Sequence, residues 1–508
     1  MSSPLPNVIF SLGMTWNLEL IPETAQLLAV VCALGYVVIA TMVSRKESTY
    51  PPRVCGLLPW VGPVISFTFR RSDFITLCEK RYGSVFRFVL GGRRVTVVGS
   101  LEAIHSVLVS DFRALTTRAQ NYEHLRVVGS DSSLYQKLHE TAVREIFPIL
   151  DRHFAKRNLG DITPHFAEMV FNTLKVFSGS DHMSLKQSVT EPLYIATNAI
   201  LLGSRFSPDT YNDFVTFNSS LPSRLSRSPF WSFPSSRARE RLRQHIFKYL
   251  EDADVTNGDD KLATSIIKVF QEPGFPRSGA VSLILAFLVA LHISMFNVVF
   301  WLMTWLLADP AALSAVRDEI DKAVLQEFGS VQAFLAEVTP ESLEPPSFAL
   351  LHSAILETLR LSAMTTGLRV AECDFDMKDG ERTIQISKGE SVVVFSRAVH
   401  QNEASYPNSH KFVVDRFMRY KDQGNMVHTP SKTYFPFGAG KHLCKGRYLA
   451  IYQLKVLAIV YLSLFDVTPV PQGGRSSEWV PPRPSAQSLT AIHPIEDVFV
   501  KLRPRFTL

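Results

Sequence analysis

The sequence predicts a mainly α-helical fold with small β-sheets, in which one large domain follows an N-terminal transmembrane helix. The first observation behind this prediction is an uncharged run at 25–43, which is long enough to span a bilayer. The second is that helical patterns dominate while strand-like runs are short. The helical patterns fill most of 100–220 and recur at 278–308, 312–326, 349–362 and 445–465. The third is a content of 46% hydrophobic residues in 508, ample for one large core.

Charge and cysteine content narrow the classes of protein. The net charge is only +6, and no cluster of Lys and Arg predicts nucleic-acid binding. A local basic patch could still bind an acidic protein partner. The cysteines are few and scattered, which indicates neither a disulfide framework nor a zinc site; they are Cys32, Cys55, Cys78, Cys373 and Cys444. Any cysteine chemistry therefore depends on a single residue.

The run 25–43 is interpreted as a signal anchor. As a helix it would span roughly 29 Å, close to the bilayer core of about 30 Å. A cleaved signal peptide needs a basic segment ahead of a shorter apolar core, but here Glu19 and Glu23 precede the run, and Arg45 and Lys46 follow it. The positive-inside rule then places 1–24 in the lumen and the domain 65–508 in the cytosol. The basic and proline-rich segment 44–64 between them is a candidate stiff hinge.

Along the domain, 82–99 predicts a β-hairpin that turns at Gly91 and Gly92. The stretch 221–243 mixes Pro, Ser, Arg and aromatic residues; it is either a solvated loop and helix start or a loop that dips into the bilayer. The uncharged run 278–308 is either a second transmembrane helix or a buried central helix. Strands are also predicted at 383–394 and, as short pieces, at 479–502.

The strongest motif is FPFGAGKHLCKGRYLA at 435–450. Two simple alternatives exist: Cys444 could be a buried small side chain, or Gly440-Lys441 could belong to a phosphate loop. The second fails because Phe435 stands where the loop needs its first Gly, and His442 replaces its Ser or Thr. The pattern F-x-x-G-x-[RH]-x-C-x-G resembles the haem-ligand loop of the cytochrome P-450 family.

This resemblance implies a cytochrome P-450 fold that binds haem b through the thiolate of Cys444, which pushes electron density onto the iron. Gly440 and Gly446 would let the backbone pass close to the porphyrin and the sulfur. A helix that starts near Lys445 would direct N–H groups at the thiolate. The remaining cofactor-binding residues implied are Phe437 beside the ligand, and His442 and Arg369 as partners of the haem propionates.

A second resemblance lies in Glu357-Thr358-Leu359-Arg360, the E-x-x-R motif of the family. Spacing of three residues places Glu357 and Arg360 on one helix face, where such pairs are commonly only surface salt bridges. The sequence FVVDRF at 412–417 resembles the F-x-P-x-R-F motif, with Val414 in place of Pro. The resemblance, which runs from about residue 51 to the C-terminus, implies that Arg416 joins the pair in a buried structural triad.

The central helix departs from the family pattern. Aligned back from Asp309-Pro310, the A/G-G-x-D/E-T-T motif becomes ALHISM at 290–295. Ile293 replaces the acid of the proton relay, and Ser294 replaces its threonine but keeps a hydroxyl. Ala290, Ile293 and Ser294 are the candidate catalytic residues. His292 is either a core histidine bonded to a backbone carbonyl or a group facing the reaction centre. The Trp and Arg that usually clamp a propionate are missing.

Phe300-Trp301 and GAGKHLCKGRYLA at 438–450 resemble the clan of prostacyclin synthase and bile-acid sterol hydroxylases, including its fungal secondary-metabolite members. The resemblance implies a microsomal monooxygenase of the endoplasmic reticulum, which oxidises a bulky apolar small molecule with O2. Its electrons would come from NADPH–cytochrome P-450 reductase, with cytochrome b5 as a further candidate donor, through a basic face with Lys441, Lys445 and Arg447. The candidate substrate pocket contains Ala290, His292, Ser294, Thr365 and Thr366.

Two other hypotheses remain at this point. The altered pair at Ile293 and Ser294 favours oxidative coupling, ring formation or rearrangement without net oxygen insertion. A non-enzymatic membrane protein with two spans would satisfy the hydropathy pattern, but it leaves the haem motifs unexplained.

Overall fold

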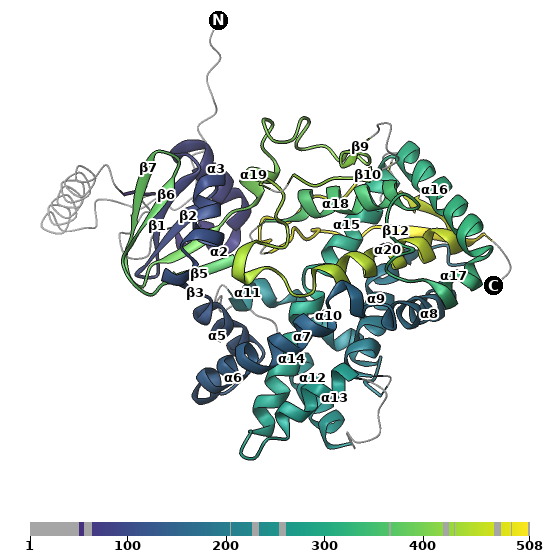
Figure 1. Cartoon of the computed structure of the whole chain (residues 1–508), viewed down its shortest axis with the longest axis horizontal. Helices are drawn as coiled ribbons and strands as arrows, with labels where there is room; N and C mark the ends of the chain where they lie inside the picture. The colour runs from purple at the N-terminus through teal and green to yellow at the C-terminus, as the bar shows by residue number, and fades with distance from the viewer. Residues whose placement is uncertain are drawn as a thin grey trace, which may run out of the picture.

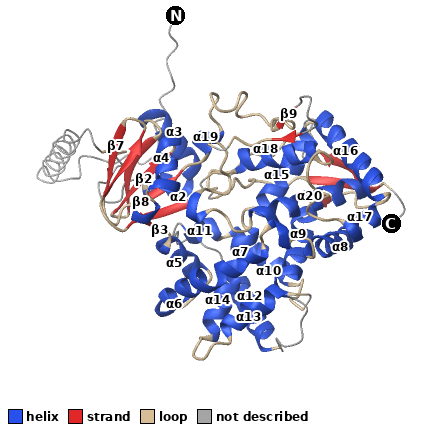
Figure 2. Ribbon diagram, in the orientation of Figure 1, coloured by secondary structure: helices blue, strands red, loops and turns tan. Residues whose placement is uncertain are grey.

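A computed structural model describes residues 50–54, 63–203, 205–225, 233–252, 261–364, 367–419, 426–430, 432–471, 479–488 and 490–505. The N-terminal segment 1–24, the predicted anchor 25–43 and most of the predicted hinge 44–64 lie outside the described residues. The domain is mainly helical and its sheets are small; the strands β1, β2, β6 and β7 lie at one end of the view, and β9, β10 and β12 lie at the other (Figures 1 and 2). The predicted fold class, mainly α-helical with small β-sheets in one large domain, is confirmed; the predicted transmembrane helix stays a prediction.

The largest sheet has five strands in the order β1-β2-β8-β5-β3. The predicted hairpin is confirmed as β1 (Val85–Leu90) and β2 (Arg93–Val98), which pair antiparallel around Gly91 and Gly92. Both glycines have positive φ, which a tight hairpin turn requires. β2 pairs in parallel with β8 (Ser391–Val394), while β5 (Gly367–Ala371) and β3 (Leu115–Thr116) complete the sheet as antiparallel strands.

Three smaller sheets lie outside this one. β6 (Phe375–Asp379) pairs with β7 (Arg382–Ile386), and β9 (Met418–Arg419) pairs with β10 (Met426–Val427). The third sheet has the order β11-β12-β4; its strands are β11 (Phe465–Val470), β12 (Phe499–Pro504) and β4 (Met183–Ser184). The prediction of several short strands at 479–502 was wrong: the described part is loop apart from two isolated bridges and the start of β12. Prolines at 481, 482, 484 and 494 remove backbone donors there.

The helices carry most of the chain. Two helices precede the first hairpin: α2 (Val64–Phe69) and α3 (Arg71–Tyr82). Between the hairpin and the central helix lie α4 (Leu101–His105), α5 (Arg118–Val127), α6 (Tyr135–Thr141), α7 (Phe147–His153), α8 (Ile162–Leu174), α9 (Leu185–Leu202), α10 (Thr210–Ser219), α11 (Leu221–Leu225), α12 (Phe233–Glu251) and α13 (Lys261–Phe270). The others are α14 (Arg277–His292), α15 (Met295–Ala308), α16 (Pro310–Phe328), α17 (Val331–Glu337), α18 (Ala349–Ser362), α19 (Arg397–His400) and α20 (Arg447–Leu464).

The predicted central helix exists, but it is interrupted: α14 ends at His292, and α15 starts at Met295. At the break, the side-chain amide of Asn297 donates to the carbonyl oxygen of Ile293 at 2.8 Å. α15 packs against α18 and α9, and its Phe300 and Trp301 are buried. Asp309 ends α15 and caps α16 by accepting from the Ala312 N–H at 3.0 Å.

Two helical stretches of the described residues are long and apolar enough to cross a membrane, judged by length and composition alone. They are Arg277–Ala308 and Arg447–Leu464, of whose most apolar windows 56% and 83% lie buried inside the domain. A long apolar helix that packs into a protein core passes the same test. The packing of α15 and α20 in the main hydrophobic core favours the interpretation of 278–308 as a buried central helix.

Candidate active site

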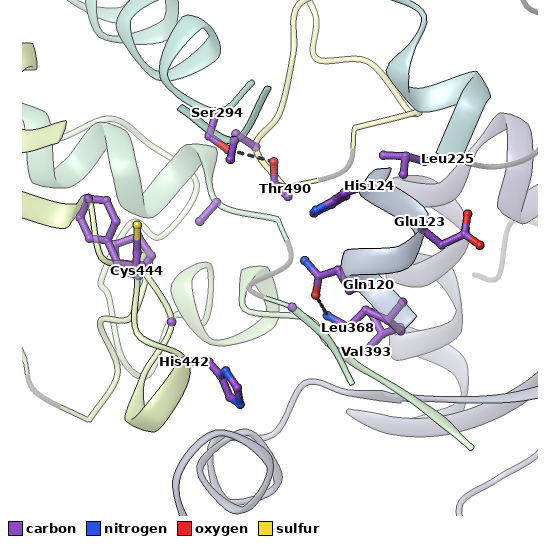
Figure 3. A pocket seen from close by; sticks show the side chains of 18 of the residues that line it. Gln120, Glu123, His124, Leu225, Ser294, Leu368, Val393, His442, Cys444 and Thr490 are labelled. Carbon is purple, nitrogen blue, oxygen red and sulfur yellow. Dashed lines mark hydrogen bonds between the residues drawn. The ribbon is translucent and has the colours of Figure 1, made fainter. Parts of the chain in front are cut away.

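A cavity of about 970 Å³ lies between the large sheet, the broken central helix and the loop that contains Cys444. This volume is at the upper end of the range of about 300–1,000 Å³ for small-molecule sites. The walls are mainly apolar, and α5 contributes a short polar stretch. In Figure 3, the sulfur of Cys444 points into the cavity from one side. The surface by which Cys444 is exposed therefore faces this cavity.

Close backbone contacts shape the loop that presents Cys444. The Cys444 N–H donates to the Phe437 carbonyl oxygen at 3.0 Å, and Leu443 N–H donates to Gly440 O at 3.1 Å. Gly440 has a φ of 64°, and a Cβ at this position would lie 2.1 Å from the carbonyl oxygen of Leu108. No side chain fits there, which explains why the motif needs glycine at 440.

The thiol of Cys444 is held in a mixed electrostatic environment. Burial raises its pKa, while the Gly446 N–H, Arg447 and Lys445 act in the opposite direction. α20 begins at Arg447, so the first N–H groups of this helix and its dipole favour negative charge at the sulfur. Arg447 donates to the Cys444 carbonyl oxygen at 3.1 Å and stacks on Tyr448.

The surroundings of Cys444 fit a haem. Phe437, His442 and Gly446 line the cavity with it, and a Cβ at residue 446 would have no atom within 4 Å, so there is room beside the sulfur. Arg369 is 5% exposed, and among the described residues its side chain has only a carbonyl acceptor, that of Leu368. Arg369 also lowers the pKa of His442 electrostatically, after burial. These two groups thus lie close enough to hold anionic propionates.

The usual helix contact to a propionate has no counterpart among the described residues. The helix that should supply it is formed by α6, a π-helical stretch and α7. Two residues of this helix, Phe147 and Leu150, line the cavity, as does Phe154 directly after α7. All three are apolar. The missing Trp and Arg noted in the sequence are therefore not replaced by another cation from this helix.

The three residues of the predicted triad are in contact, and Arg416 is half-buried at the edge of the group. Glu357 accepts from the Nε and Nη2 of Arg360, both at 2.7 Å, and from the Nε of Arg416 at 2.9 Å. Glu357 and Arg360 are fully buried. Arg360 also donates to the carbonyl oxygens of His400 and Ser409. Because the ring of His400 accepts from the N–H of Phe435 at 3.1 Å, the triad is connected to the start of the Cys444 loop.

The helix break faces the cavity with Ala290, Leu291 and Ser294. The hydroxyl of Ser294 is 2.9 Å from that of Thr490, which comes from the C-terminal loop and also lines the cavity. Figure 3 shows this pair across the cavity from His442. Ile293 does not line the cavity; it packs against the main core. Leu291, in place of the family glycine, does occupy the wall.

His292 is not a pocket residue, which corrects the prediction that placed it there. It is fully buried, and its Nε2 bonds the Asn198 side-chain oxygen at 3.0 Å, not a backbone carbonyl. The rings of Tyr194, Phe214 and Phe296 surround it, and burial lowers its pKa to about 3. The other two predicted pocket residues, Thr365 and Thr366, lie outside the described residues.

The polar cavity residues that sequence reasoning missed include Gln120, His124 and Thr490. The spacing of Gln120 and His124 on one helix face was a usable signal. Nothing local marked Thr490, because its partner Ser294 is 196 positions away.

Comparison with known proteins supports the interpretation of this site. The family model described as "Cytochrome P450" matches residues 52–479. The chain belongs to the cytochrome P450 family. Among curated relatives, the cholesterol 7-alpha-monooxygenase of Cricetulus griseus is 22% identical over 475 residues, covering 86% of this chain and 90% of that protein. Cytochrome P450 7B1 of Mus musculus is 25% identical over 451 residues, covering 82% and 84%.

The structure is also similar to that of the cyanobacterial CYP120A1 bound to retinoic acid, with a TM-score of 0.69 and 18% sequence identity. The match covers 90% of this chain and 100% of the other. This cytochrome P450 is therefore an oxidoreductase of the monooxygenase type with a haem cofactor, and Cys444 is the cysteine that ligates the haem iron. The non-enzymatic hypothesis is wrong.

Proposed function

We propose that this cytochrome P450 is a microsomal monooxygenase that oxidises a bulky apolar small molecule, with O2 and electrons from a flavoprotein reductase. The observation that carries the proposal is the continuity of the large, mainly apolar cavity with the sulfur of Cys444. The names of the relatives add support, since one hydroxylates cholesterol and the solved neighbour binds retinoic acid. Both ligands have large apolar skeletons, and retinoic acid also carries a carboxylate. The product would belong to secondary metabolism, as proposed from the fungal-type motif at 438–450.

In this mechanism, haem supplies the activation of oxygen when it is bound. Cys444 would hold the iron, while Arg369 and His442 would hold the propionates. The triad of Glu357, Arg360 and Arg416 would hold the loop before Cys444 in position. The connection runs through His400, whose carbonyl oxygen accepts from Arg360 and whose ring accepts from the Phe435 N–H. The apolar walls exclude water from the substrate. The hydroxyls of Ser294 and Thr490, which are hydrogen-bonded to each other in the cavity wall, would hold a water molecule or pass on a proton there.

Electrons would enter from the face where α20 begins. Of the three basic residues proposed there, Lys441 is exposed, whereas Lys445 and Arg447 are half-buried. Arg447 is turned onto the Cys444 carbonyl oxygen. Lys441 is therefore the best placed of the three to contact NADPH–cytochrome P-450 reductase or cytochrome b5 through an acidic surface.

The second candidate function is oxidative coupling, ring formation or rearrangement without net insertion of oxygen. One observation favours it: the acid that family members use to deliver protons is replaced by Ile293, which is half-buried and packs against the main core. The hydroxyls of Ser294 and Thr490 relay protons but do not supply them near neutral pH. A reaction that needs fewer protons at this site would be less affected by that loss.

The proposed location is the endoplasmic reticulum membrane, with one span at 25–43 and a cytosolic catalytic domain. Asn218 provides a test, because Asn218-Ser219-Ser220 is a formal glycosylation site. A cytosolic domain leaves Asn218 unmodified when the full chain is expressed in a eukaryotic cell. A glycan there contradicts the orientation.

The function is tested with the purified, haem-loaded full chain. The reduced carbon-monoxide spectrum should show the band of a thiolate-ligated haem, and its absence would contradict the haem site. Incubation with 18O2, the reductase and apolar substrates, including products of neighbouring biosynthetic genes, should then give a product that carries the label. An unlabelled product would favour coupling or rearrangement.

A further inference from the structure

The wall of the cavity formed by α5 carries two polar side chains among apolar ones. Gln120 and His124 are four residues apart, which places them on the same face of α5. Both line the cavity. Figure 3 shows them on the opposite side of the cavity from Cys444, with His124 directed toward the space between Thr490 and Gln120. These two side chains are the polar pair of α5.

The hydrogen bonds of Gln120 determine which end of its amide faces the cavity. The N–H of Leu368 donates to the Gln120 side-chain oxygen at 3.3 Å. A backbone N–H needs an acceptor, so the oxygen is assigned to that side, and the amide nitrogen is left toward His124 and the cavity (Figure 3). The described residues provide no hydrogen-bond acceptor for this nitrogen.

His124 adds a second group with free hydrogen-bonding capacity. Within the described part of the chain, neither ring nitrogen of His124 has a hydrogen-bond partner. Burial lowers its pKa, against a smaller opposite effect of Glu123, so the ring is neutral at physiological pH. A neutral imidazole offers one donor and one acceptor.

The neighbours of the polar pair do not satisfy it. Glu123 also lines the cavity, but its carboxylate accepts from Arg126 at 2.7 Å, and Figure 3 shows it directed away from His124. The surrounding wall is apolar; it includes Leu225, Phe287, Leu291, Leu368 and Val393. A buried polar group without a partner is costly, so a ligand that fills this space with hydrocarbon alone would leave the pair unsatisfied.

We propose that Gln120 and His124 bind a neutral oxygen, a hydroxyl or a carbonyl, at the end of the substrate remote from Cys444. The substrate class is therefore a bulky apolar molecule with one neutral oxygen at the end opposite to the oxidised carbon. This inference deepens the proposed function and rests on it. An oxygen there accepts from the Gln120 amide nitrogen, and a hydroxyl also donates to His124 or accepts from it, depending on the tautomer.

A carboxylate is the competing ligand chemistry, and the observations disfavour it at this position. The polar pair has no net charge, so a carboxylate buried against it would be uncompensated. Cations line the cavity elsewhere: Arg71 and Arg93 on the α3 and β2 side, and Lys445 next to Cys444, where it is paired with Asp151. A carboxylate substrate would therefore depend on those two arginines and not on Gln120 and His124.

The test measures binding of matched probes to the haem-loaded full chain, from the shift of the haem absorption band. The probes are cholesterol with its 3-deoxy analogue cholest-5-ene, and retinol with its hydrocarbon analogue axerophthene and with retinoic acid. The variants are His124→Phe and Gln120→Met, which keep side-chain size. Arg118→Gln is the control, because Arg118 is exposed on the same helix and does not line the cavity. Arg71→Gln tests the carboxylate alternative.

Wild-type protein should bind at least one alcohol more tightly than its hydrocarbon. His124→Phe and Gln120→Met should each weaken that alcohol roughly three- to tenfold, the range for one net hydrogen bond. They should leave the hydrocarbon affinity and the carbon-monoxide spectrum unchanged, which also shows that the variants are folded. Arg118→Gln should change neither affinity.

Equal losses for alcohol and hydrocarbon would overturn the inference, because they indicate a role in cavity shape only. The inference would also be overturned if retinoic acid bound more tightly than retinol, and if this preference were lost in Arg71→Gln but kept in His124→Phe. Failure of every probe to bind the wild-type protein contradicts the proposed function itself and the inference with it.

Discussion

Replacement of Arg360 by methionine is expected to be among the most destabilising single changes in this domain. Arg360 neutralises Glu357 through two bonds of 2.7 Å, and both side chains are fully buried. Breaking a buried ion pair costs about 3–5 kcal/mol. Arg360→Met also leaves the carbonyl oxygens of His400 and Ser409 without this donor, at about 1–3 kcal/mol for each unsatisfied group. Because Arg416 still contacts Glu357 and the losses overlap, we expect a total of about 4–6 kcal/mol.

The assay is thermal unfolding of the haem-loaded chain, followed by circular dichroism and by loss of the haem absorption band. With an unfolding entropy of roughly 2 cal/mol/K per residue, a chain of this size loses about 1 °C of Tm per kcal/mol. Arg360→Met should thus lower Tm by about 4–6 °C. Arg70→Met is the matched control: Arg70 and Asp73 have the same spacing of three residues, but both are exposed, so less than about 1 kcal/mol is expected. Equal Tm values for the two variants would refute the reasoning.

Three further predictions concern the loop, the helix break and pH. Gly440→Ala should lower the haem content of the purified protein, because the added methyl meets the Leu108 carbonyl oxygen; Gly160→Ala, with no atom within 4 Å, should leave the haem-to-protein ratio unchanged. Ser294→Ala should increase the hydrogen peroxide released per NADPH consumed, and Thr490→Val should do the same if the bonded pair of hydroxyls is the relay; normal coupling in both would contradict the relay. Burial lowers the pKa of His292, His352 and His400 to about 3, so only the unfolded chain binds these protons between pH 6.5 and 3. As the pH is lowered from 6.5 toward 3, the free energy of unfolding therefore decreases by about 1.4 kcal/mol per pH unit for each histidine. His352→Gln should reduce the slope of Tm against pH, and an unchanged slope would argue against the burial of His352 as a neutral group.

The side of the site that holds Cys444 could be predicted from the sequence because its determinants are local. The spacing of Glu357 and Arg360 within one helix, and the loop from Phe437 to Gly446, each fit within a single motif. The joining of Arg416 to Glu357 came from a resemblance, since no local pattern brings residues 59 positions apart together. The contact that makes Gly440 necessary, with the Leu108 carbonyl, is visible only in the fold.

The opposite side could be predicted only in part, because its contacts join distant segments. The substitution at 293–294 was visible, but the partner of Ser294 was not, since Thr490 lies in a loop that the sequence suggested to be strand. His292 was placed in the pocket by its nearness to Ser294. A one-residue step rotates a helix by about 100°, which is enough to turn its side chain into the core toward Asn198.

These two sides of the cavity make different demands on the substrate. The Cys444 side is held by buried charges and tight backbone contacts, so it needs nothing from the ligand. The Ser294 side has hydroxyls but no acid, and hydroxyls of Ser and Thr pass protons on without storing them near neutral pH. We infer that protons must come from water or from the substrate itself. A substrate anchored at Gln120 and His124 would then set how much water reaches Ser294 and Thr490, and so whether oxygen is inserted or the cycle ends as coupling or as wasted peroxide.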